Sequence, residues 1–418
     1  MQHSKIINGI DIGSSKVTTI IGQYFETEDR FNIIAVASSP ALGFRKSQII
    51  NLEQAIDTIT KSVESAERMA GMQIKEAHIS LAAAHIQSLN SKGVVAVSNP
   101  KGEIVANDVD RVIEAAKAIT LPSGKEIIHI IPRVFTVDGQ EGVVDPIGMN
   151  GVRLEVETNI IVASAPALRN LEKCLNEVGV NPQSLVYAGL STATIALTDT
   201  EKELGVALID IGGTTTSITI FNESSPCYAA VLPVGATNVT NDLAIGLRFS
   251  LDDAEKIKLK LTKFLENKNY EDEIDLSHFG IESDQRKLSL QTAVNGIIKP
   301  RLEEIFSLID QEIDNSGYKS LIPAGIVMTG GGALTIMAKE VCSNTIPLPL
   351  RIAIPPKIGG LVDEILNPAF TSSVGLLMYG FNQEKKGKTT SSSHKSKAKV
   401  SVGSLFGRFK DLIEPLLP

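Results

Sequence analysis

Residues 9–22 (GIDIGSSKVTTIIG) and residues 208–221 (LIDIGGTTTSITIF) repeat one pattern, and this repeat decides the fold. In each copy an apolar, β-branched strand ends in Asp-Ile-Gly, turns through hydroxyl-bearing residues and returns as a second apolar strand. The two aspartates are Asp11 and Asp210. A duplicated strand–turn–strand predicts two similar α/β domains that face each other across a cleft.

The composition limits the class of protein. The chain has 418 residues, of which 43% are hydrophobic, which is enough apolar content for several packed domains. Its three cysteines form no CxxC pair, so neither a disulfide scaffold nor a zinc module is expected. The N-terminal residues carry no apolar signal core, and no run of about 18 apolar residues is present, so secretion and a membrane-spanning helix are not expected either.

Charge is unevenly distributed along the chain. The net charge is −8 overall, whereas residues 382–418 carry seven Lys and one Arg against three acidic residues, a net of +5 that leaves −13 for the rest. An acidic body argues against nucleic acid as a partner. The basic end therefore needs an explanation of its own.

The two turns contain groups that suit a polyphosphate. Backbone N–H groups in a glycine-containing turn can surround phosphate oxygens, and the hydroxyls add further donors. The two aspartates can hold a hydrated Mg²⁺, and a lysine supplies a positive charge. Taken singly, each motif can equally be an ordinary β-hairpin. The predicted phosphate ligands are Gly13, Ser14, Ser15 and Lys16 in the first turn and Gly212, Gly213, Thr214 and Thr215 in the second.

A third turn, Gly330-Gly331-Gly332, follows the apolar strand 326–328. Three glycines between a strand and a helix allow a ligand to approach the backbone closely. The alternative is a tight strand–helix turn with no ligand. Neither the GxGxxG fingerprint nor a GxxxxGK[ST] P-loop occurs in the chain.

The order of these motifs resembles that of the actin, heat-shock chaperone and sugar kinase superfamily, in which two phosphate motifs precede an adenosine motif. Residues 126–157, residues 77–98 and the apolar C-terminal segment are similar to FtsA, the bacterial cell-division actin homologue. The resemblance covers nearly the whole chain. It implies an α/β fold of two actin-like (ribonuclease H-like) domains around a nucleotide cleft that takes ATP and Mg²⁺, with an inserted α+β subdomain and a C-terminal amphipathic helix on a flexible linker.

Domain boundaries follow from the resemblance and from composition. A helix over 51–70 with Asn51 as its N-cap, another over 165–178, and one capped by Asn107 are the clearest local expectations. The expected division is 1–83 with 163–195 for the first actin-like domain, 84–162 for the inserted subdomain, 196–227 with 305–381 for the second domain, 228–304 for its upper lobe, 382–401 for the flexible linker and 402–418 for the amphipathic helix.

Two features bear on how nucleotide is used. The superfamily's ribose and adenine ligands match Glu255 and Lys258, which lie three residues apart on one helix face, although a surface ion pair is the alternative. The superfamily's Glu or Gln that orients the attacking water has no counterpart in residues 188–192 (AGLST). We therefore expect ATP binding with slow hydrolysis at most, no catalytic residue, and nucleotide as an assembly switch.

Residues 404–414 form an amphipathic pattern when placed on a helix. The basic linker before them favours an anionic membrane surface, and docking on the chain's own body or on a partner protein are the alternatives. FtsA proteins use this segment as a membrane target. The predicted membrane-binding residues are Leu405, Phe406, Phe409, Leu412 and Ile413.

The resemblance implies a cell-division protein that polymerises with itself and tethers FtsZ filaments to the inner face of the cytoplasmic membrane, where later division proteins are recruited. The tail of FtsZ is expected in a groove at Asn238, Ser250 and Arg301, while Ala293 stands where the family has a basic residue. A small-molecule kinase of the same fold and a pilus-assembly adaptor of the same superfamily are the alternatives. The first needs an acceptor base near the hairpins, which is not seen, and neither explains the tail.

Overall fold

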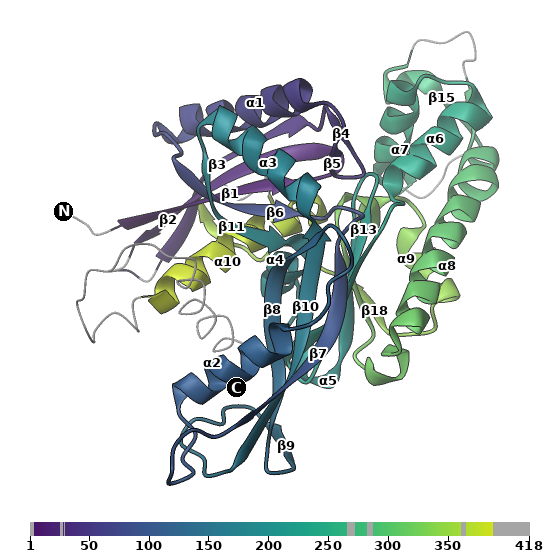
Figure 1. Cartoon of the computed structure of the whole chain (residues 1–418). Coiled ribbons are helices and arrows are strands. Elements are labelled where there is room, and N and C mark those ends of the chain that lie inside the picture. The colour runs from purple at the N-terminus through teal and green to yellow at the C-terminus, as the bar shows by residue number, and fades with distance from the viewer. Residues whose placement is uncertain are drawn as a thin grey trace.

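Two large β-sheets form the framework of the protein, one for each copy of the repeated pattern (Figure 1). The computed structural model describes residues 4–25, 28, 30–265, 272–281, 287–360 and 365–387. The first sheet has the strand order β11-β6-β1-β2-β3-β19, with β1 Ser4–Ile12, β2 Lys16–Phe25, β3 Arg30–Pro40, β6 Glu76–Leu81, β11 Asn181–Tyr187 and β19 Gly359–Gly360. The second has the order β18-β17-β12-β13-β14-β7-β10-β8-β9, with β7 Gln87–Ala96, β8 Lys125–Val137, β9 Gln140–Val143, β10 Arg153–Ser164, β12 Val206–Ile211, β13 Thr216–Asn222, β14 Ser225–Leu232, β17 Ile326–Thr329 and β18 Leu350–Ile352.

Helices cover both faces of the first sheet. Helices α1 (Leu52–Ala70) and α3 (Ala165–Val178) pack on the face that carries Ile10 and Ile12, whereas α10 (Thr371–Gly387) packs on the face that carries Ile7 and Ile20. Alternating side chains of a strand point to opposite faces, so the continuous apolar run of β1 is needed because both faces are buried. The small hairpin of β4 (Phe44–Arg45) and β5 (Gln48–Ile49) stands beside α1.

The second sheet is covered in the same way. Its β12 pairs with β13 as an antiparallel hairpin and with β17 in parallel, just as β1 pairs with β2 and β6. The elements on its faces are α4 (Ala188–Ala196), α5 (Asp199–Leu204), α6 (Ala236–Leu247), α7 (Leu251–Leu265), α8 (Lys299–Ser316) and α9 (Ala338–Thr345). Helix α4 packs against α10 between the two sheets. The structure therefore has two similar α/β units, as the repeat predicts.

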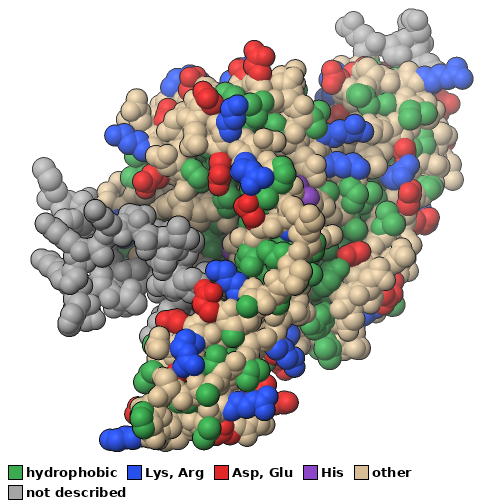
Figure 2. Space-filling model, in the orientation of Figure 1, with side chains coloured by type: hydrophobic (Ala, Val, Ile, Leu, Met, Phe, Trp, Pro, Cys, Tyr) green, Lys and Arg blue, Asp and Glu red, His purple; other side chains and the backbone are tan. Residues whose placement is uncertain are grey.

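The inserted segment is a three-stranded antiparallel sheet, β7-β10-β8, with β9 at its edge and α2 (Ala106–Lys117) packed on it. In the chain it interrupts the first domain, yet its sheet continues the second one through a single bridge between Gln87 and Ala230. It projects from the body, and Figure 2 shows charges of both signs mixed over its visible face. Ion pairs of the insert include Lys92–Glu157 and Arg153–Glu155.

The upper lobe differs from its expected bounds of 228–304. Residue 228 lies inside β14 and residue 304 inside α8, because both elements continue into the core of the second domain. Within the lobe, α6 and α7 pack together beside the short hairpin of β15 (Glu273–Asp275) and β16 (Lys287–Ser289). A π-helix over Gln291–Ile298 leads directly into α8.

Local details test several expected boundaries. Asn51 caps α1 by accepting a hydrogen bond from Gln54 N at 3.0 Å, which confirms that prediction. The prediction for Asn107 was wrong: the N-cap of α2 is Val105, two residues earlier, and Asp108 accepts a hydrogen bond from Val105 N. Helix α10 runs through Gly387, past the expected end of the globular part at 381.

The extension of α10 has a packing cause. Phe381 contacts the rings of Tyr24 and Phe31, and Glu384 pairs with Lys5, so these residues belong to the folded body. The amphipathic helix predicted over 402–418 lies outside the described residues. Among the residues that are described, no helix is both long and apolar enough to cross a membrane.

Candidate functional site

The two Asp-Ile-Gly turns touch each other. Thr214 N donates a hydrogen bond of 2.9 Å to Ser14 Oγ, which joins the two copies of the pattern directly. A Cβ atom on Gly213 would lie 2.7 Å from the Cβ of Ser15, so glycine is required where the turns meet. The structure thus brings the predicted phosphate ligands of both turns into one place.

The second turn is also tied to the start of α6. Ala236 N donates to Gly212 O at 3.0 Å and Thr237 N donates to Gly213 O at 2.7 Å. Beside these contacts the buried Oγ1 atom of Thr214 has no hydrogen-bond partner among the described residues. A buried hydroxyl without a partner is costly, and a ligand oxygen in the turn would satisfy it.

Asp11 and Asp210 lie at the ends of β1 and β12 in corresponding registers, opposite Thr18 and Ser217. Burial raises the pKa of both carboxyls, and the charge of Asp11 further raises the pKa of Asp210, to about 7. Two half-buried carboxylates that disfavour each other's charge are stabilised by a cation held near both. This donor set fits a hydrated Mg²⁺, which needs few protein ligands.

Hydroxyl groups from two helices steady the aspartates. Ser373 Oγ donates to Asp11 at 2.8 Å and Ser372 Oγ donates to it at 3.2 Å, both from the first turn of α10. Thr192 Oγ1 of α4 lies 3.5 Å from Asp210. Sequence reasoning missed the two serines, because nothing near them in the chain marks them as neighbours of the first turn.

Lys16 lies at the site with its ammonium over an aromatic ring. Its Nζ is 3.3 Å from the ring centroid of Phe370. Burial lowers the pKa of Lys16 to about 8, and the charge of Asp11 opposes that shift. The predicted phosphate-binding lysine is thus present, but Phe370, which holds it in this structure, was not foreseen.

The third turn packs against the second. Gly330 has a φ of +87°, and a Cβ there would lie 2.3 Å from Asp210 Oδ1. A Cβ on Gly332 would lie 2.3 Å from the side chain of Ile211, whereas Gly331 has only the Cβ of Ala369 within 4 Å, at 3.5 Å. Packing alone therefore requires glycine at positions 330 and 332. This agrees with the alternative interpretation of a tight strand–helix turn with no ligand. Gly331 is the member of the three that leaves room beside the site.

Glu255 and Lys258 share one face of α7, as their spacing predicts. Lys258 Nζ is 2.7 Å from Glu255 Oε2 and donates to Thr240 Oγ1 at 2.9 Å and to Ala236 O at 3.3 Å. Lys258 is 6% exposed whereas the side chain of Glu255 is 42% exposed, so the ion pair has one buried and one solvent-exposed partner. Because Ala236 also bonds Gly212, the pair lies next to the second turn.

The three residues of the expected partner groove lie along α6 rather than at one point. Asn238 Oδ1 accepts from Gly235 N at 3.1 Å at the start of α6, and Ser250 Oγ accepts from Asp253 N at 3.1 Å beyond its end. The rise of α6 from Asn238 to its last residue, Leu247, is about 14 Å, and Ser250 lies three residues further along the chain. Arg301 of α8 reaches Asp242 on α6 and also pairs with Glu304.

Ala293, at the position where the resemblance expects a basic residue, is fully buried in the π-helix. A charged side chain there would have to be buried as well.

The two sheets and the paired turns define an actin-like protein, and solved structures of that fold align with the chain over most of its length. The PilM-PilN type IV pilus biogenesis complex aligns with a TM-score of 0.61 at 15% identity, over 90% of this chain and 98% of that one. MreB5 of Spiroplasma citri bound to AMPPNP aligns with a TM-score of 0.54 at 14% identity, over 92% and 98%. At these identities the likeness shows the fold.

Sequence comparisons narrow the class to one family. A family model described as the SHS2 domain inserted in FtsA matches residues 83–162, and another described as cell division protein FtsA matches 207–375. Cell division protein FtsA of Pseudomonas aeruginosa is 36% identical over 95% of this chain and 94% of its own length. Those of Bacillus subtilis and Escherichia coli K12 are 35% and 30% identical, over 91% and 97% of this chain and 84% and 96% of their own lengths. The chain belongs to the FtsA family of cell division proteins.

Proposed function

We propose that this protein binds ATP with Mg²⁺ where the two turns meet. The observation that carries the proposal is the Ser14–Thr214 hydrogen bond, which joins the two Asp-Ile-Gly turns. The carboxyl groups of Asp11 and Asp210 lie at the start of these turns. Backbone N–H groups of both turns would hold the phosphates, and Asp11 and Asp210 would hold the hydrated ion, whose charge offsets that of the phosphates. Glu255 and Lys258 would contact the nucleoside.

Bound nucleotide acts as an assembly switch in this proposal. The helix that faces Asp210 begins with Ala188–Thr192 and offers a hydroxyl at 3.5 Å, with no carboxylate or amide in that stretch. A positioned base is what a hydrolytic site needs to activate water. Slow turnover leaves the bound state long-lived enough to control polymerisation.

The wider role we infer is to tether FtsZ filaments to the inner face of the cytoplasmic membrane at the division site and to recruit later division proteins. Family membership supports it, as do the basic residues and the amphipathic pattern that follow α10. Five partly buried apolar side chains, at about 1.5–3 kcal/mol each when fully buried, give one chain only a weak, reversible anchor. A polymer with many such anchors binds far more tightly through effective concentration.

The FtsZ tail is proposed to lie along α6. Arg301 of the neighbouring α8 pairs with Asp242 of α6 and with Glu304, so its charge is already partly balanced before a partner arrives. Ile245 on the same helix is 78% exposed and offers an apolar contact between the positions of Asn238 and Ser250.

Liposome flotation with ATP and Mg²⁺ tests the membrane role. The full chain is compared with a chain that ends at Gly387, so that α10 stays intact, and with a Phe406→Glu, Phe409→Glu variant. A Thr389→Glu, Thr390→Glu variant makes the same charge change in the linker and serves as the matched control. We expect the full chain and the control to float and the other two to stay in solution. Flotation of all four, or of none, would contradict the proposed anchor.

A further inference from the structure

One short segment contacts both the first and the third turn of the candidate site. Residues 367–373 comprise the 3₁₀ turn Pro368–Phe370 and the start of α10. Pro368 O accepts from Gly330 N at 3.2 Å, and Ser373 donates to Asp11. Phe370 lies under Lys16. The segment is thus anchored on both sides of Phe370, which fixes the position of the ring.

The contact between Lys16 and Phe370 is a favourable cation–π interaction. An ammonium over the face of an aromatic ring is attracted by the ring's quadrupole, and more strongly when water is partly excluded. Lys16 is half-buried, and its Nζ lies 3.3 Å from the ring centroid. Asp11 is the nearby carboxylate that acts on it, and that group is engaged by Ser372 and Ser373. The ring is therefore a preferred position for the ammonium in this structure.

A phosphate in the turn would compete for the same ammonium. A lysine has a flexible four-carbon stem, so its head can leave the ring without any backbone change. The contact between the ammonium and the ring is lost once the ammonium moves to a phosphate. Binding of a polyphosphate by Lys16 would then cost its contact with the ring of Phe370.

We propose that Phe370 is a positioning residue that holds Lys16 in the ligand-free protein and competes with a polyphosphate for its ammonium. The inference rests on the proposed nucleotide site. Its consequence is that removal of the ring strengthens binding, because the ligand-free state loses a stabilising contact. For a partly desolvated cation–π contact we expect about three- to tenfold tighter binding.

The experiment is a double-mutant cycle on the full chain, with Mg²⁺·ATP titrated by calorimetry. Phe370→Leu is measured with Lys16 present and again with Lys16→Met, which keeps the stem and removes the charge. Phe370→Tyr keeps the ring face and serves as the conservative control. We expect Phe370→Leu to tighten binding only when Lys16 is present, and Phe370→Tyr to bind as the parent does.

Two results would overturn the proposal. Weaker or unchanged binding by Phe370→Leu shows that the ring does not compete, and an equal change in both lysine backgrounds shows that the ring acts independently of Lys16. In either case Mg²⁺·ATP still binds, and the proposed nucleotide site stands. If the parent chain fails to bind Mg²⁺·ATP at all, the nucleotide site falls together with the role of Phe370.

Discussion

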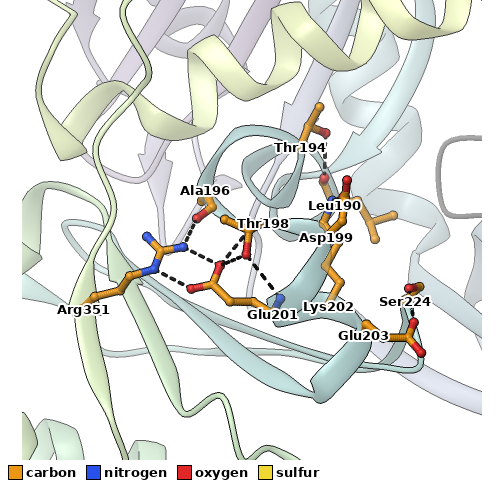
Figure 3. Close-up of polar contacts among 10 residues, drawn as sticks. All are labelled: Leu190, Thr194, Ala196, Thr198, Asp199, Glu201, Lys202, Glu203, Ser224 and Arg351. Atoms are coloured by element: carbon orange, nitrogen blue, oxygen red, sulfur yellow. Dashed lines mark hydrogen bonds and ion pairs between the residues drawn. The ribbon is translucent and has the colours of Figure 1, made fainter. Parts of the chain in front are cut away.

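Arg351 and Glu201 form an ion pair at the joint where α4, α5 and β18 meet (Figure 3). Arg351 Nε and Nη2 each lie 2.6 Å from a carboxylate oxygen of Glu201, and Nη2 also donates to Ala196 O at 2.6 Å. Glu201 in turn accepts from Thr198 N at 2.8 Å. The guanidinium thus ties the end of α4 and the start of α5 to β18. Its hydrogen bonds lower the pKa of Glu201 to about 2.

Glu201→Gln should destabilise the protein in a pH-dependent way. A carboxyl whose pKa is lower in the folded state contributes stability that is fully present above its unfolded pKa and is lost as the pH falls through its folded pKa. We expect a loss of about 1–3 kcal/mol in the free energy of unfolding at pH 7, and a progressively smaller loss from pH 4.5 toward pH 2. Thermal unfolding at several pH values measures it.

Glu203→Gln is the matched control for that substitution. Glu203 is exposed and accepts a hydrogen bond of 2.6 Å from Ser224 (Figure 3). Its effect should stay within about 0.5 kcal/mol. If Glu201→Gln and Glu203→Gln prove equally mild at neutral pH, the Arg351 pair does not stabilise the joint.

At the scale of elements, the sequence predicts well those hairpins and helix ends that depend on residues close together in the chain. Both hairpins form as the repeat indicates, and α3 spans the expected 165–178, since Gly179 in the left-handed region ends it locally. Pairings between distant segments could not be predicted. The contact of Phe370 with Lys16, the bridge of β7 to β14 and the extension of α10 depend on packing that no local pattern encodes.

The glycines of the third turn allow a comparison between neighbours. Gly330→Ala forces a Cβ into a left-handed φ and to within 2.4 Å of Ile211 O, so we expect a loss of about 2–4 kcal/mol in stability and weaker ATP binding. Gly331→Ala meets only ordinary van der Waals contact with Ala369, so the fold should keep its stability. Thermal unfolding and an ATP titration of both variants measure these effects. Equal stability of the two would refute the packing argument.

At the scale of the whole molecule, polar side chains attach the inserted subdomain to the second domain. Asn159 Nδ2 donates to Asn90 Oδ1 at 2.7 Å and to Cys227 O at 3.0 Å, and Asn90 Nδ2 donates to the same carbonyl at 3.2 Å. Asn159 is fully buried, so these bonds are shielded from water. Beyond the single bridge of Gln87 with Ala230, they hold the insert to the second domain.

Asn159→Ala should loosen that attachment without unfolding either domain. It leaves the carbonyl of Cys227 with one donor fewer, at a cost of about 1–3 kcal/mol. Hydrogen exchange should quicken in β14 and in the adjoining end of β7, and stay unchanged in β1 and β2. Asn99→Ala, in a turn of the insert far from the second domain, is the control. Unchanged exchange at β14 would show that the asparagines do not carry the attachment.

The attachment of the insert also has a mechanical side. Its strands leave the first domain at residues 81–87 and meet the second domain at the bridge of Gln87 with Ala230 and at the Asn90 and Asn159 hydrogen bonds. They then run outward along β8, whose 13 residues extend about 43 Å. The insert would therefore act as a lever arm that pivots where it meets the two domains. A relative rotation of about 5° at this pivot would swing the far end by about 4 Å. A small relative movement of the two Asp-Ile-Gly turns would thus be amplified into a larger displacement at the tip of the insert.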